Sequence, residues 1–187
     1  AGRQGGTRPN GHQNCSNIAC RDRRMDITGS GGMVMKERIS ELYALLLGQD
    51  GKTAYKALQT LQQLSEESAD VYSYMDQFAD MLDSENSYIR TRGLTLIAYN
   101  AKWDTDYKVD EMIDKYLEHI TDIKPITARQ CIKLLPKIAK AKPELKDDIL
   151  SALRKADASI FPDSMQSLVY KDIRNSLAEI QTEAKDS

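Results

Sequence analysis

Apolar residues recur at intervals of three and four from Val34 onward, which is the period of amphipathic α-helices. Short polar stretches rich in Gly, Pro, Asp and Asn separate these segments, and such residues commonly start and end helices. The pattern therefore predicts an all-α domain of eight helices. They are expected over residues 34–47, 52–65, 70–82, 87–102, 109–120, 125–140, 144–156 and 164–180.

Signals at the helix ends support this assignment. A side-chain oxygen of Asn86 or Ser87 can accept hydrogen bonds from the free backbone N–H groups of the helix that follows. Pro125 suits a first helical turn, where its missing N–H costs no hydrogen bond. Pro136 falls inside the helix expected over 125–140 and predicts a kink there.

The second, fourth and sixth predicted helices can be laid over one another. Small residues fill one slot at steps of 36 and 38 residues, and aliphatic residues fill the slots beside it. The slots hold Ala57, Gly93 and Cys131; Leu58, Leu94 and Ile132; and Leu61, Ile97 and Leu135. A further step of 42 adds Ile173 and Leu177 to the slots of Cys131 and Leu135. A two-helix period of about 40 residues is typical of helical solenoids, because one pair cannot bury its apolar face alone.

The stretch from residue 83 to residue 101 resembles the second helix of a HEAT repeat. The resemblance is strongest over residues 70–139 and rests on the order Asp83, Ile89, Arg90, Gly93, Leu94 and Ile97. It implies a right-handed alpha-alpha superhelix, a short HEAT-like solenoid of about four helix pairs. It also implies that second helices line the concave side and first helices the convex side. Neither Ala54 nor Ala128 keeps an arginine at the position of Arg90, although Arg129 is one place away.

The domain as a whole is similar to small stand-alone HEAT-like proteins of Gram-positive bacteria, some of which carry the label SufBD protein. That label suggests iron–sulfur assembly. The predicted domain contains a single cysteine, Cys131, in an inward slot, so its sequence gives that function little support.

Residues 1–32 differ in composition from the rest of the chain. They are rich in Gly, Arg and Asn without helical or strand periodicity, which predicts a flexible leader added before a natural start at Met33 or Met35. A single HEAT-like helical repeat domain is expected over 33–182, followed by a frayed tail over 183–187. His12, Cys15 and Cys20 could ligate a metal, but a zinc site needs four organised ligands, and none is expected here.

Several features favour a cytoplasmic location. The aliphatic runs are too short to cross a bilayer, and the amino terminus lacks the apolar core of a secretory signal. The three cysteines are too scattered to form a disulfide framework.

The predicted domain has no catalytic constellation. Its cysteine, Cys131, shares a slot with small residues, and its histidine, His119, lies in a last helical turn where positive charge suits the dipole. A glycine-rich phosphate loop and metal-ligand spacing are both missing from the sequence. We therefore expect no enzyme, no catalytic or metal-binding residue, no cofactor and no small-molecule substrate.

Charge is unevenly distributed between the helices. The four second helices carry twelve basic and three acidic residues, whereas the four first helices carry six basic and thirteen acidic residues. In the superhelix that the resemblance implies, this predicts a basic concave face. The residues expected to bind a partner there are Lys56, Arg92, Thr95, Tyr99, Lys133 and Lys137.

The favoured function is a non-enzymatic interaction scaffold or adaptor whose concave face binds an acidic peptide or protein. One alternative is nucleic-acid binding, with the same lysines contacting phosphates. In a third interpretation the lysines only solvate that face. Tyr99, Trp103 and Tyr107 either form an aromatic anchor or fill the joint between repeats, and the second role is preferred for Trp103.

Overall fold

The computed structural model describes Gly2 and residues 31–183. Most of the expected leader, the candidate ligands His12, Cys15 and Cys20, and residues 184–187 of the expected tail lie outside this part of the chain. The described residues form eight α-helices and five short 3-10 segments, without a strand among them.

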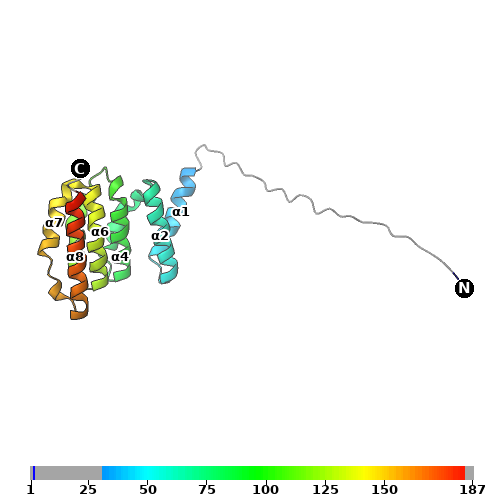
Figure 1. Ribbon diagram of the computed structural model, residues 1–187. Coiled ribbons are helices and arrows are strands. Elements are labelled where there is room, and N and C mark those ends of the chain that lie inside the picture. Colours follow the sequence, from blue (N-terminus) through cyan, green and yellow to red (C-terminus); the bar gives the residue numbers. More distant parts are fainter. Residues whose placement is uncertain (1, 3–30, 184–187) are drawn as a thin grey trace.

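The helices follow one another in pairs. These are α1 (Gly31–Leu46) with α2 (Gly51–Glu67), α3 (Met75–Met81) with α4 (Ser87–Asn100), α5 (Lys108–Glu118) with α6 (Pro125–Ala141), and α7 (Lys146–Lys155) with α8 (Asp163–Glu183). The 3-10 segments are η1 (Asp70–Tyr74), η2 (Ala101–Trp103), η3 (His119–Thr121), η4 (Pro143–Leu145) and η5 (Ala158–Ile160). Helices α2, α4, α6 and α8 lie side by side, with α4 packed between α2 and α6 (Figure 1). The expected all-α helical-repeat architecture is confirmed.

The helix ends differ from the predictions in small ways. Helix α1 begins at Gly31, inside the run expected to be a linker. The helix predicted over 70–82 divides into η1 and α3, because a 3-10 turn often opens a helix. Asn86 caps α4, since its side-chain oxygen accepts from the backbone N–H of Tyr88 at 3.0 Å. Pro125 opens α6, and Pro136 lies inside it.

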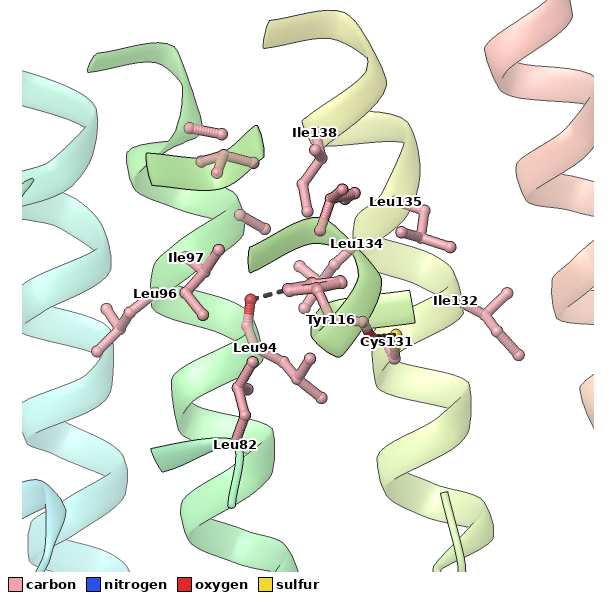
Figure 2. Packing of buried hydrophobic residues seen from close by; sticks show 14 of the residues in the cluster. Leu82, Leu94, Leu96, Ile97, Tyr116, Cys131, Ile132, Leu134, Leu135 and Ile138 are labelled. Carbon is pink, nitrogen blue, oxygen red and sulfur yellow. Dashed lines mark hydrogen bonds between the residues drawn. The ribbon is translucent and has the colours of Figure 1, made fainter. Parts of the chain in front are cut away.

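The core follows the slots found in the sequence. Figure 2 shows Leu94 of α4 facing the α6 side of the core, with Tyr116 of α5 lying between the two helices. Ile97 of α4 is fully buried in the same cluster. The hydroxyl of Tyr116 donates to the carbonyl oxygen of Leu94 at 3.1 Å. Cys131 and Leu135 of α6 are fully buried in the same cluster. The second helices therefore pack in the register that their spacing predicts.

Gly93 is required by close helix approach. A Cβ at this position would lie 2.9 Å from both Met81 Cβ and the carbonyl oxygen of Phe78. Helix α3 thus contacts the backbone of α4 directly, which explains why the slot of Gly93 holds small residues.

Polar contacts also tie one repeat to the next. The indole Nε1 of Trp103 donates to the carbonyl oxygen of Ser65 at 2.7 Å, so Trp103 does fill the joint between repeats. The side-chain amide of Asn100 donates to the Ser65 hydroxyl at 2.9 Å, and both of these residues are buried. Lys108 pairs with Asp76 at 2.6 Å across the first helices.

Candidate functional site

A groove of about 710 Å³ lies over the first half of α4, between α4 and α2. The α1–α2 turn and helix α2 border one side of it, α4 forms its floor, and Gln130 of α6 borders the other side. We call it the α4 groove. Its lining includes Tyr55, Gln62, Tyr88, Arg92, Thr95 and Gln130.

Arg92 is the unusual residue of the α4 groove. Its side chain lines the groove although the residue is only 9% exposed. Nη1 donates to the carbonyl oxygen of Leu46, the last residue of α1, where the helix dipole is negative. Within the described part of the chain this is its one hydrogen bond, and no carboxylate pairs with it. Most of its five N–H donors therefore have no acceptor among the described residues.

Arg90, two residues earlier, has the opposite environment. Its Nε and Nη2 each donate to the Asp122 carboxylate at 2.7 Å, and Nη1 donates to the carbonyl oxygens of Ser84 and Glu85. The hydrogen bond to Asp122 raises the pKa of Arg90. Burial without such a partner instead lowers the pKa of Arg92, which nonetheless stays charged because arginine does not lose its proton in proteins. A buried charge without a counter-ion costs free energy, and an anion entering the α4 groove would offset that cost.

Aromatic and amide side chains surround the charge. Tyr55 is 58% exposed and Tyr88 is 73% exposed, so both rings are available at the rim. Gln62 and Gln130 supply amide groups that can donate or accept. Tyrosine and arginine are residue types that dominate binding energy in protein interfaces. The groove therefore contains residue types that are common in protein interfaces.

A second hollow, of about 370 Å³, lies over the other half of α4. We call it the Glu66 hollow. It is lined by Glu66, Ala98, Tyr99, Lys102, Lys137, Lys140 and Ala141. Its carboxylate comes from the last turn of α2, and its lysines from η2 and α6.

Glu66 is held by two lysines. Nζ of Lys102 donates to Oε2 and Nζ of Lys137 donates to Oε1, each at 2.7 Å. Nζ of Lys137 also lies 4.2 Å from the ring centre of Tyr99. Hydrogen bonds from the two lysines lower the pKa of Glu66, so the carboxylate is ionised at neutral pH. The contact joins α2 to α6 across α4.

The six residues predicted to bind a partner do not lie together. Arg92 and Thr95 line the α4 groove, whereas Tyr99 and Lys137 line the Glu66 hollow. Lys133 is exposed with Nζ at 3.8 Å from Asp172. Lys56 is exposed on α2.

Two of these residues differ from the prediction in exposure. The sequence places Arg92 and Thr95 on an outward face, and this is wrong, because α2 and α6 pack against α4 from both sides. Thr95 is 2% exposed, and its hydroxyl donates to the carbonyl oxygen of Thr91 at 2.7 Å.

Lys142 shows that the charge count overstates the basic surface. It is 4% exposed, and its Nζ lies 3.2 Å from Asp104, 2.8 Å from Asp110 and 3.0 Å from Glu144. These ion pairs raise its pKa although burial acts in the other direction. Lys142 is therefore part of the scaffold and not of the accessible face.

Sequence reasoning missed Tyr55, Tyr88 and Glu66. A signal for Glu66 exists, because it is the one acidic residue in the segments 52–66, 87–102 and 127–142. No comparable signal marks Tyr55 and Tyr88, because helical periodicity predicts only that a residue is exposed. It does not tell whether an exposed residue lies beside a groove or on open surface.

The remaining candidate groups have structural roles. Cys131 is buried, and burial raises the pKa of its thiol well above the ordinary value, which disfavours the reactive thiolate. Nδ1 of His119 lies 2.9 Å from Oδ2 of Asp122, so the imidazole contacts the same carboxylate that pairs with Arg90. Among the described residues, no cluster of His, Cys, Asp or Glu could hold a metal ion. A bilayer-crossing helix, judged by length and hydropathy, does not occur in the same part of the chain.

Comparison with protein families identifies one relationship. A family model described as HEAT repeat domain matches residues 31–177. Comparison with curated proteins and with solved structures gave no match. Repeats of the matched kind generally act as scaffolds for protein interactions and are typically not enzymes.

Proposed function

We propose, since this chain belongs to the HEAT repeat domain family, that its second-helix face binds an acidic segment of a partner protein. The α4 groove is the principal site in this proposal, and a carboxylate of the partner meets Arg92. The domain then serves as a non-enzymatic scaffold or adaptor, in the cytoplasmic setting expected from its sequence.

The observation that carries the proposal is the isolation of Arg92. The residue is only 9% exposed, its side chain lines a groove, and its guanidinium has one backbone carbonyl as its partner. A carboxylate can accept two parallel hydrogen bonds from a guanidinium, and such bidentate pairs are among the stronger polar contacts. The ligand would thus neutralise a charge that the fold leaves unpaired.

The geometry favours a peptide over a nucleic acid. A nucleic-acid backbone gains affinity from many simultaneous phosphate contacts along a basic strip. The α4 groove offers a ligand one cation, the buried Arg92, and not a strip of several. One desolvated arginine beside tyrosine rings suits one acidic side chain on a short segment.

The test is fluorescence anisotropy with labelled hexaglutamate, hexaglutamine and a single-stranded oligonucleotide as probes. The proposal expects hexaglutamate to bind and hexaglutamine not to bind. Arg92→Gln should weaken hexaglutamate binding about tenfold or more, which is the effect of losing a desolvated charge pair. Arg154→Gln is the matched control, because Arg154 is exposed on α7 and its loss changes the net charge equally.

Circular dichroism of Arg92→Gln checks the fold, since Arg92 also contacts the end of α1. Arg92→Lys, which keeps the charge but loses the fork of donors, should retain part of the binding. Equal affinity of Arg92→Gln and wild type would overturn the proposal. Tighter binding of the oligonucleotide, with a steep salt dependence, would favour nucleic-acid binding instead.

A further inference from the structure

We infer that Lys102, Lys137 and Tyr99 form a second carboxylate-binding site, which Glu66 fills in the free protein and an acidic side chain of the partner takes over in the complex. The inference rests on the proposed function, because one acidic segment would occupy both sites. The chemical class of the ligand is a protein carboxylate.

The contacts around Glu66 are those that a bound carboxylate would make. Each of its oxygens receives one ammonium donor at 2.7 Å, from Lys102 and Lys137 respectively. Tyr99 holds the Lys137 ammonium 4.2 Å from its ring centre and so fixes one of the two donors. The lysines of the Glu66 hollow thus already hold one carboxylate, which is the chemical group proposed for the ligand.

Glu66 can leave without disrupting the fold. Its side chain is 44% exposed, and the side chains of Lys102 and Lys137 are each 36% exposed. Ion pairs with this exposure contribute little to stability, since both partners are well solvated when apart. The tether to α2 nevertheless gives Glu66 a high effective concentration, so it competes with any external carboxylate.

The two sites are placed for one ligand. Tyr99 follows Arg92 by seven residues on α4, which returns the chain to the same side of the helix. Seven residues rise about 10 Å along a helix. An extended peptide covers that length in about three residues. A short acidic segment can thus reach the α4 groove and the Glu66 hollow together.

The test compares Glu66→Gln with Glu67→Gln, using labelled hexaglutamate as the probe. Glu67 is the neighbouring residue, and its substitution changes the net charge by the same amount as that of Glu66. It is exposed, and its carboxylate accepts from the Gln63 amide at 3.0 Å. Glu66→Gln should tighten binding roughly fivefold, the size of one partly exposed ion pair. Glu67→Gln should stay close to wild type, and adding Lys137→Gln to Glu66→Gln should remove the gain.

Trp103 provides a second readout, since it is the one tryptophan of the chain and Nζ of Lys102 lies 5.1 Å from its ring centre. Hexaglutamate should change its emission in wild type and at lower concentrations in Glu66→Gln. If wild type binds and Arg92→Gln does not, but Glu66→Gln behaves as wild type, the inference is wrong and the proposed function stands. If Glu66→Gln alone binds, through Lys137, the inference holds and the role of Arg92 is wrong. Absence of binding to both proteins overturns both.

Discussion

The Arg90 guanidinium and the Asp122 carboxylate face each other through two hydrogen bonds of 2.7 Å, from Nε and Nη2, in a buried setting. Arg90 belongs to α4, and Asp122 lies in the connection between η3 and α6. The backbone N–H of Lys124 also donates to Asp122, at 2.8 Å. The pair therefore fixes the entry to α6 against the start of α4, and with it the angle between two second helices.

Removing the charge of Asp122 should destabilise the fold. Asp122→Asn leaves the Arg90 guanidinium buried without a counter-ion, which typically costs about 3–5 kcal/mol. Asp83→Asn is the control, because it breaks the exposed pair between Asp83 and Lys115 and should cost less than about 1 kcal/mol. Urea unfolding monitored by circular dichroism measures both. Equal losses in the two variants would contradict the structural role of the buried pair.

Acidification should remove the stabilisation that the Asp122 carboxylate gives to the fold. Burial acts to raise the pKa of Asp122, but hydrogen bonds from Arg90, the Lys124 backbone and His119 outweigh it and hold the pKa below the ordinary value of 3.8. A carboxyl whose folded pKa is lowered stabilises the fold fully above its unfolded pKa and loses that effect as pH falls through the folded pKa. The difference in unfolding free energy between wild type and Asp122→Asn should therefore shrink as pH falls below 3.8. A difference that stays constant as the pH falls well below 3.8 would count against this prediction.

A methyl group at Gly93 should also destabilise the repeat. Alanine normally favours a helix over glycine by up to about 1 kcal/mol. At Gly93 the new Cβ meets the carbonyl oxygen of Phe78 at 2.9 Å, and backbone cannot move away as a flexible side chain can. Overpacking of this kind costs about 1–3 kcal/mol, so the net effect of Gly93→Ala is a loss of stability.

Gly51→Ala is the matched control for Gly93→Ala. A Cβ at Gly51 meets nothing within 4 Å, and this residue opens α2. Its substitution should be neutral or slightly stabilising in thermal unfolding. A stabilising effect at Gly93 equal to that at Gly51 would mean that α3 is not packed against the α4 backbone.

The repeat could be predicted from sequence because its packing is periodic. The slots of Gly93, Leu94 and Ile97 are filled again by small or aliphatic residues in the neighbouring second helices, and helical period alone gives their inward direction. The Arg90 pair could not be found in this way, since its partner Asp122 stands in a connection and not in a helix. Its position depends on how two repeats stack.

The candidate site was less predictable than the core. Helical period placed Arg92 outward, but burial of this face depends on how closely α2 and α6 approach α4. Charge counting likewise treated Lys137 as free, whereas Glu66, 71 residues earlier, reaches it across α4. Contacts that span three helices leave no periodic signal along the chain.

Mapping the bound peptide on the protein tests the central proposal most directly. Isotope-labelled protein titrated with hexaglutamate and followed by NMR should show the largest shifts at Arg92 Nε–H and at the amides of Tyr88, Thr95 and Tyr99. Shifts that spread over the exposed faces of α5 and α7, or that leave the Arg92 side chain unchanged, would contradict binding in the α4 groove.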